Sequence, residues 1–532
     1  DMKMKASKLH QAWMALATIF AIGACAGLQK EEAAGDRSAA SEKAPAKSSD
    51  PAATKAVAEF AHTPDAEFRA QKPPPFPTTP HFAAPVPVQR KLKNGIPVLI
   101  VENHQLPIVA VDLVVKTGRD GDPIAKAGLS DLVAAMLTEG TRTRSAPEFA
   151  EAVDNLAAQL TAQALQSATR VHLNCLSDTL PEAIDLLADA VQHPAFRPPD
   201  FERVRGIHVA RLMQKKGTPW MIADDEMNRA LYGAKHPWGQ PSGGTLPTAK
   251  SIAQADLVKF YNAWYHPNNV FISISGDTSP DEVIKVLEAR FAGWKAKPLP
   301  KIALPPLPSL KTRTITLVDK PGASQSQVWV GGRLFPANHP DATPMRVANY
   351  VLGGLFSSRL NLNLREDKAY SYGVRSRVSL AKTTGTIIAS GGIIAQNTPE
   401  ALVEYEKELV RFAKGDITDE ELAKAKAGDV VRLPSLLETN DAVAIAISGL
   451  VLDGLPLDYF KTLPEEVGKV TKSDISRVVS KYLKPSQWPV IVVGPRIGNE
   501  DKIRDLNLGP VEVRSVDEKP AAPKPAQASL GG

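Results

Sequence analysis

The sequence has few cysteines and no cluster of basic residues. Only Cys25 and Cys175 occur among its 532 residues. Its 63 lysines and arginines are interspersed with 58 acidic residues, which leaves a net charge of +5. Proteins that bind nucleic acids carry a basic stripe or patch, so this dispersed charge does not indicate a nucleic-acid partner. A chain of this length exceeds one hydrophobic core and is expected to form at least two domains.

The N-terminal segment, residues 1–25, lacks an apolar run long enough to cross a bilayer. Three lysines precede an apolar stretch from Ala12 to Ala24, which is the pattern of a secretory signal peptide. The stretch ends in IGAC and resembles a bacterial lipobox, so Cys25 is the predicted lipidation site. A cleaved signal with a chance cysteine is the alternative. Ala26, in place of an Asp, favours anchoring in the outer membrane of a Gram-negative cell envelope, facing the periplasm. Cys175 then has no intramolecular partner and is predicted to be a small buried residue.

The segments near both ends have few large apolar side chains. Residues 26–84 are rich in Ala, Lys, Glu, Ser and Pro, and residues 513–532 repeat this composition. Such segments cannot bury enough apolar surface to offset their ordering entropy. We therefore predict a disordered tether at 26–84 and a disordered tail at 513–532, with residues 76–86 extended along the first domain.

Two stretches of similar sequence indicate an internal duplication. Residues 256–276 match residues 474–494 in the spacing of Asp, Pro and Gly, at an offset of 474 − 256 = 218. The same offset relates the Pro-Glu-Ala at 181–183 to that at 399–401. A shared offset at two separate places predicts a repeated domain. The predicted domains are 85–294 and 312–512, and the Pro-rich residues 295–311 are the predicted linker.

Each half combines strand patterns with amphipathic helices. This order predicts an α+β fold in which helices pack on a largely antiparallel sheet. The strands expected in the first half are a pair across 88–102, then 108–117, a pair across 159–176, and 270–275. Those expected in the second half are 312–319, 326–332, 372–379, 385–393 and the PVIVV segment. The helices expected are 128–138, 147–157, 181–192, 199–216, 221–232, 254–264 and 342–353.

The segment Gly128–Thr141, GLSDLVAAMLTEGT, resembles the inverted zinc motif of pitrilysin-type (insulinase-like) peptidases. In that frame two His residues hold zinc, and a Glu between them activates water. Here Asp131 replaces the first His, Ala134 the Glu and Ala135 the second His. An ordinary amphipathic helix is the alternative interpretation. Other segments with the family's order and spacing are KNGIPVLIVENHQLPIVAVDLVVKTG, HPWG, YHPNN and LRE, so the resemblance extends over about residues 85–510.

The resemblance implies that the chain is a member without zinc ligands. The family's third ligand is a Glu on a long helix, and Ala210 and Arg211 occupy the corresponding positions. One Asp with His208 does not make the three-ligand site of catalytic zinc, although another metal at Asp131 and His208 remains an alternative. No cofactor is expected in this chain, and zinc is expected in a partner subunit. The other His residues beyond the signal show no metal-binding spacing and are expected in turns or on the surface.

The resemblance also identifies a pair of residues in the second half. Arg365 and Tyr372 match the family's Arg/Tyr pair, in which the phenol donates to the developing oxyanion and the guanidinium holds a substrate carbonyl. Tyr370 is an alternative phenol. The other interpretation is that Arg365 pairs with a neighbouring carboxylate and Tyr372 packs in a strand.

These features predict a non-zinc subunit of a heterodimeric metalloendopeptidase that degrades unfolded peptides in the cell envelope. The partner would be a zinc-bearing relative, and this chain would supply Arg365 and Tyr372. The first alternative is a scaffold or peptide-binding module of the same fold that takes no part in hydrolysis. The second is an independent activity with unusual chemistry.

Overall fold

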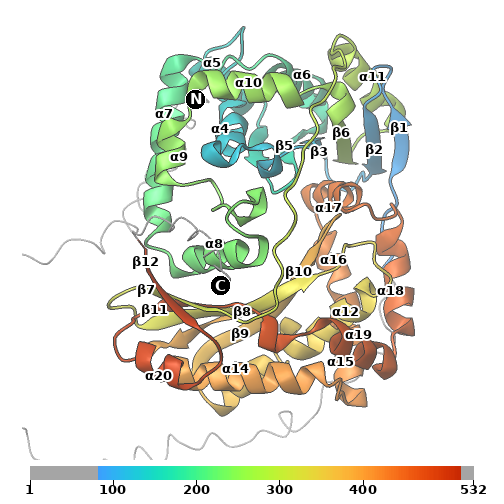
Figure 1. Ribbon diagram of the computed structural model, residues 1–532. Coiled ribbons are helices and arrows are strands. Elements are labelled where there is room, and N and C mark those ends of the chain that lie inside the picture. The colour runs from blue at the N-terminus through green and yellow to red at the C-terminus, as the bar shows by residue number, and fades with distance from the viewer. Residues whose placement is uncertain (1–81, 517–532) are drawn as a thin grey trace, which may run out of the picture. The chain divides into compact units, whose positions relative to one another are not determined.

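The computed structural model of the protein describes residues 82–516 (Figure 1). The predicted signal peptide, the lipidation site at Cys25 and most of the predicted tether and tail lie outside the described residues. None of the helices between residues 82 and 516 has by itself the length and hydropathy of a membrane span. The bent pair 419–436 and 440–453 meets those two criteria only when taken together.

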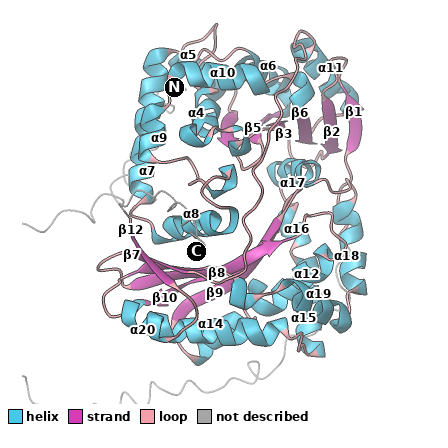
Figure 2. Cartoon of the chain, viewed as in Figure 1, coloured by secondary structure: helices cyan, strands magenta, loops and turns pink. Residues whose placement is uncertain are grey.

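The described residues contain two six-stranded sheets (Figure 2). The first has the order β1-β2-β6-β3-β5-β4, and the second has the order β12-β7-β11-β8-β10-β9. The strands of the first sheet are β1 (Val88–Lys91), β2 (Pro97–Glu102), β3 (Ile108–Val115), β4 (Gln159–Ala164), β5 (Thr169–Leu176) and β6 (Val270–Gly276). Those of the second sheet are β7 (Ile315–Asp319), β8 (Gln325–Leu334), β9 (Ser371–Leu380), β10 (Gly385–Ile394), β11 (Val490–Gly494) and β12 (Val511–Ser515).

The two sheets share one strand arrangement. From the second strand onward, β2, β6, β3, β5 and β4 correspond in order to β7, β11, β8, β10 and β9. The parallel pair β2/β6 corresponds to the parallel pair β7/β11, and the next three strands are antiparallel in both sheets. The strands β6 and β11 end at Gly276 and Gly494, which are separated by the predicted offset of 494 − 276 = 218. The predicted α+β fold with two duplicated domains is therefore confirmed.

Helices follow the strands where apolar side chains recur with helical spacing. In α6 the buried Ala183, Ile184 and Leu187 lie on one face and pack toward the sheet. The other helices of the first half are α4 (Leu129–Met136), α5 (Ala146–Asn155), α7 (Pro198–Lys215), α8 (Pro219–Tyr232), α9 (Leu246–Ser251), α10 (Gln254–Trp264) and α11 (Pro280–Phe291), with α6 at Leu180–Gln192. Those of the second half are α12 (Ala342–Asn349), α13 (Arg359–Asn361), α14 (Thr398–Ala413), α15 (Asp419–Val431), α16 (Leu433–Leu436), α17 (Asn440–Asp453), α18 (Tyr459–Lys469), α19 (Lys472–Tyr482) and α20 (Glu500–Asp505).

Each half contributes one helix to the sheet of the other half. Helix α8 of the first half packs on β8 and β11, and α17 of the second half packs on β3 and β6 (Figure 1). Met227 of α8 shares a buried cluster with Ile491 of β11, and Val451 of α17 packs against a cluster that contains Phe271 of β6. Because the two exchanged helices occupy equivalent places in the duplicated halves, burial of apolar surface holds the halves together.

Two predictions about the ends of the folded region need correction. Phe82 and Ala84 belong to the predicted tether, yet Ala84 is buried in the apolar cluster of the second half and Phe82 packs against it. Residues 513–515 belong to the predicted tail, but β12 pairs in parallel with β7. The side chains of β12 are only partly buried because it is an edge strand, so its sequence lacks the apolar run that marks an inner strand. Residues 295–311 contain no helix or strand.

Candidate functional site

The degenerate zinc-motif segment forms helix α4, as predicted. Leu129, Leu132, Val133 and Met136 are buried on its inner face, so the spacing i, i+3, i+4 and i+7 fixes the helix against the sheet. Gly128 precedes it with φ of 95°, a left-handed conformation that favours glycine. A Cβ at Gly128 would also lie 2.3 Å from the carbonyl oxygen of Gly243. The glycine of the motif thus has a structural role that does not depend on a metal.

Asp131, on the outer face of α4, is held by an arginine. Arg119 donates from Nε to Oδ2 of Asp131 at 3.0 Å and from Nη2 to Oδ1 at 2.8 Å. The side chains are 27% and 18% exposed, so water screens this pair only in part. A bidentate guanidinium–carboxylate contact is among the stronger charge-assisted hydrogen bonds. Both carboxylate oxygens of Asp131 are therefore engaged by a protein cation.

A cavity of about 450 Å³ lies beside this ion pair. Its wall comes from α4, α7, the edge strand β4 and the Ser242-Gly243 turn. The volume is in the range of small-ligand sites. The residues that line it are Arg119, Asp131, Ala135, Glu139, Ala162, Gln163, Ala164, Val204, Ile207, His208, Arg211, Leu212, Lys215, Met221, Ser242 and Gly243.

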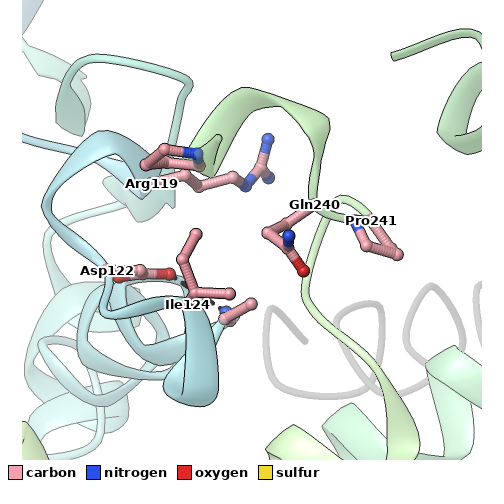
Figure 3. A pocket seen from close by; sticks show the side chains of 8 residues that line it. Arg119, Asp122, Ile124, Gln240 and Pro241 are labelled. Carbon is pink, nitrogen blue, oxygen red and sulfur yellow. Dashed lines mark hydrogen bonds between the residues drawn. The ribbon is translucent and has the colours of Figure 1, made fainter. Parts of the chain in front are cut away.

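A much smaller cavity of about 10 Å³ is also lined by Arg119. Figure 3 shows Arg119 and Asp122 on one side of it, with Gln240 and Pro241 on the other. The buried carboxylate of Asp122 accepts hydrogen bonds from the amides of Gly128 and Ser130, at 3.0 and 2.8 Å. Burial raises the pKa of Asp122 to about 7. Asp122 therefore caps the start of α4, and this cavity has room for about one water molecule.

Most charged groups around the large cavity are already paired. Besides the Arg119–Asp131 pair, Glu139 is paired with Arg203. Lys215 Nζ lies 2.6 Å from Oδ2 of Asp225. Arg211 has no hydrogen bond or ion pair with any residue between 82 and 516. It is exposed and contributes the one cation of the wall that lacks an acidic partner in the described part of the chain.

Arg365 lies in the π-helical turn η7 (Leu362–Asp367). Single π-helical turns are frequent at functional sites. The guanidinium of Arg365 lies 4.4 Å from the centre of the Phe356 ring, and its Nε lies 3.3 Å from a carboxylate oxygen of Glu366. The ring of Phe356 is 59% exposed. The exposed ring of Phe356 and the carboxylate of Glu366 therefore position Arg365. The contact with Glu366 agrees with the interpretation that Arg365 pairs with a neighbouring carboxylate.

Tyr372 projects from a β-bulge at the start of β9. On β9, Ser371 and Val374 are three residues apart, whereas their partners Ile393 and Gly391 on β10 are two apart. The extra residue lies at Tyr372 or Gly373, and bulges commonly redirect a side chain away from the sheet alternation. Tyr372 is 86% exposed. The interpretation that Tyr372 packs within the strand is therefore wrong, because its side chain is almost fully exposed. The alternative phenol, Tyr370, packs against the core.

Two adjacent regions of the chain match descriptions of one peptidase family. Residues 97–236 match the family described as Insulinase (Peptidase family M16), and residues 251–428 match the Peptidase M16 inactive domain. The chain belongs to the insulinase (M16) peptidase family. Its fold and its altered motif place it among the inactive-type members.

Related proteins agree with this assignment. An uncharacterized zinc protease of Bacillus subtilis, YmxG, is 27% identical over 405 residues, covering 76% of this chain and 97% of that protein. The non-peptidase homolog YmxG of Helicobacter pylori is 25% identical, covering 75% and 91%. The crystal structure of a peptidase M16 inactive domain from Pseudomonas fluorescens superposes with a TM-score of 0.71 at 24% identity, covering 77% of this chain and 98% of that one. This structural likeness concerns the fold.

The residues at the M16 ligand positions do not fit a zinc ion. A metal at Asp131 would face the guanidinium of Arg119. Ala134 is buried, and Ala135 presents a methyl group to the cavity. Ala210 is exposed and does not line the cavity. Zinc requires three protein ligands with nitrogen, sulfur or carboxylate donors, and these alanines offer none.

The alternative metal site at Asp131 and His208 offers too few ligands, because Arg119 binds both oxygens of Asp131 and only one ring nitrogen of His208 lacks a hydrogen bond among the described residues. Both residues line the cavity, but Nε2 of His208 lies 2.8 Å from the carbonyl oxygen of Gly243. Between residues 82 and 516, no group of three or more His, Cys, Asp or Glu side chains is placed to hold a metal ion. The absence of zinc from the purified protein stays a prediction for elemental analysis.

The structure brings some of the predicted site residues together and leaves others apart. Asp131, Ala135 and Arg211 line one cavity, whereas Arg365 and Tyr372 do not line it. Sequence analysis missed Arg119, because nothing in the sequence shows that a residue twelve positions before Asp131 reaches its carboxylate.

The prediction that the other His residues lie in turns or on the surface holds only in part. His236 and His266 lie in turns, although both are buried and one ring nitrogen of each has a backbone partner. His172 lies instead in strand β5, and its side chain is only 16% exposed. Cys175 is buried and free, as predicted. Burial raises the pKa of its thiol to about 12, so it is unreactive near neutral pH.

Proposed function

We propose that this M16 chain is the non-zinc subunit of a heterodimeric metalloendopeptidase that degrades peptides in the cell envelope. The partner would be an M16 relative that retains the two His residues, the Glu between them and the distal Glu. This chain would contribute Arg365, Tyr372 and part of the wall of the peptide chamber. It would be attached to the outer membrane, facing the periplasm, through a lipid on Cys25.

The observation that carries this proposal is the placement of Tyr372. This phenol is exposed at a β-bulge of the edge strand β9, and no residue described in the structure accepts or donates a hydrogen bond to it. Buried tyrosines find hydrogen-bond partners within the protein, but an exposed phenol on a bulge is available to another molecule. A phenol that donates to a developing oxyanion stabilises charge that appears only in the transition state.

A second feature supports an action outside this chain. Neither Arg365 nor Tyr372 lines the cavity at the altered motif, and Arg119 neutralises Asp131 there. Arg365 and Tyr372 keep the spacing of the family's pair, although the motif of this chain has lost its zinc ligands. This combination is consistent with a pair that acts on zinc held by another subunit. The scaffold function is the second candidate, and the contact of Arg365 with Phe356 and Glu366 favours it, because a purely structural arginine would make the same contacts.

Reconstitution tests the proposal. The purified chain alone should contain no stoichiometric zinc and should not hydrolyse an unstructured fluorogenic peptide. Mixing it with an intact zinc-bearing M16 relative from the same organism should produce chelator-sensitive cleavage that neither protein shows alone. If the two proteins form a complex whose rate equals that of the zinc subunit by itself, the scaffold function replaces the catalytic one. Stoichiometric zinc together with chelator-sensitive cleavage by this chain alone would contradict both.

A further inference from the structure

The cavity at the altered motif has walls of two kinds. One part is apolar and comes from α7, α8 and β4, with Val204, Ile207, Leu212, Met221 and Ala162. The other part is charged, with Asp131 from α4, Arg211 and Lys215 from α7, and Arg119 and Glu139 from the segments before and after α4. Sites for small molecules combine a mostly apolar surface with a few polar groups that orient the ligand. The cavity therefore has the composition of a site for a ligand with an apolar body and one charged end.

The pairing of charges in the wall indicates whether the charged end of the ligand is positive or negative. The acidic groups, Asp131 and Glu139, are each neutralised by an arginine, and Lys215 is neutralised by Asp225. Arg211 remains, exposed and without a hydrogen-bonding or ionic partner among residues 82–516. A cationic ligand or a metal would have to displace an existing ion pair. An anion could bind Arg211 without displacing any of these pairs.

The geometry of a guanidinium narrows the class of anion. Its N–H groups form a planar fork that matches two oxygens of a carboxylate or of a phosphate. Arg211 is the one cation of the wall without an acidic partner among residues 82–516, and the single negative charge of a carboxylate balances it, whereas a phosphate group carries more than one negative charge near pH 7. Carboxylates joined to an apolar body suit the rest of the wall, since Ala135 and Ala162 leave space where larger side chains would fill it.

We propose that this cavity binds a carboxylate attached to an apolar body, with Arg211 holding the carboxylate in place of a metal. The carboxylate can come from the C-terminus of a peptide or from a fatty acid. The proposal concerns the isolated chain and does not depend on a zinc-bearing partner.

Calorimetric titration of the purified chain tests the site with defined probes. N-acetyl-dileucine carries a free carboxylate, and its carboxamide is the matched uncharged probe. Decanoate and decanol form the corresponding fatty pair. At least one carboxylate should bind, and its uncharged counterpart should bind at least about tenfold more weakly, because it cannot make the charge-assisted bidentate contact with the guanidinium. Which acid binds identifies the source, and chelator should not change the affinity.

Two variants test the assignment to this cavity. Arg211→Ala removes an exposed side chain, so the fold should be unaffected, and the affinity should fall about tenfold or more. Ala135→Phe leaves every charge in place but fills the cavity, and should also abolish binding. Arg142→Ala is the matched control, because Arg142 is exposed, has no described ion pair and does not line the cavity.

Three results would overturn the proposal. The first is equal binding of acid and uncharged probe, and the second is unchanged affinity in Arg211→Ala. The third is that none of the four probes binds at millimolar concentration. Because no step of this experiment uses a peptidase partner, its failure is distinguishable from failure of the proposed catalytic function.

Discussion

Arg119 donates two hydrogen bonds, of 3.0 and 2.8 Å, to the carboxylate of Asp131. The position that carries the first zinc-binding His in the M16 motif is thus occupied by an acid bound to a guanidinium. Helix α4 keeps its buried apolar face and its preceding left-handed glycine. The guanidinium of Arg119 supplies the positive charge at the altered motif. An ion pair between two side chains of this chain therefore occupies the position.

The substitution Arg119→Met should destabilise the first half of the chain. It removes the cation but keeps a side chain of similar length, and leaves Asp131, which is 18% exposed, without its partner. An uncompensated, partly buried carboxylate costs about 1–3 kcal/mol. Urea unfolding followed by fluorescence should show a lower midpoint than for the exposed control Arg142→Met. A midpoint equal to that of the control would show that the pair contributes nothing to stability.

The contact between the halves should weaken as pH rises. Burial of His172 opposes its charge, but Asp112 and Asp441, at 3.5 and 2.7 Å, outweigh this and raise its pKa above the ordinary value of 6.5. Asp441 lies in α17 of the second half and also accepts hydrogen bonds from Asn174. Arg170 on β5 is the other charged group there, and it pairs with Asp112.

The raised pKa of His172 determines whether its contribution to stability grows or falls with pH. The stabilisation by protonated His172 is fully present below the unfolded-state pKa of about 6.5 and is lost as pH rises through the folded-state value. The unfolding midpoint of the parent should therefore exceed that of His172→Gln by more at about pH 6 than at about pH 9. Taking the difference between these two proteins removes the separate titration of Asp122. A difference that does not change with pH would show that His172 is not protonated in the folded protein.

Replacing Cys25 should release the protein from the membrane. A thioether-linked diacyl group and an amide-linked acyl chain bury many methylene groups, each worth about 0.8 kcal/mol, and more than one chain is needed for stable anchoring. Cys25→Ser should therefore move the protein to the soluble periplasmic fraction and abolish palmitate labelling. Cys175→Ser is the control, since that thiol is buried in the fold. Unchanged fractionation and labelling of Cys25→Ser would remove the lipoprotein assignment.

Much of the fold could be predicted from local patterns and the repeat. Helix α10 was expected as a helix at 254–264, and the offset of 218 places its equivalent at 472–482, where α19 lies. The continuous apolar run of β11 marks a strand buried on both faces. Helix α11 was missed although Ser279 and Glu282 form a capping box at its start, a signal that the sequence contains.

The parts that could not be predicted depend on contacts between distant residues. The bulge at Tyr372 exists because of the register between β9 and β10, which no local pattern specifies. Helix α8 packs on the sheet of the second half and α17 on the sheet of the first half, and no local sequence pattern specifies these contacts. The pairing of His172 with Asp441 joins positions 269 apart in the sequence. A single sequence gives the residue types at these positions, but it does not show which distant residues contact one another.

The turnover number of the reconstituted complex tests the central claim most directly. Tyr372→Phe removes one hydroxyl from a side chain that is 86% exposed, so folding and complex formation should be unaffected. The account predicts that kcat falls about 10²-fold, the scale of one lost oxyanion donor, while Arg375→Ala, an exposed change on the same strand, leaves kcat unchanged. A Tyr372→Phe complex that cleaves peptides as fast as the parent would contradict the account and leave the chain a scaffold.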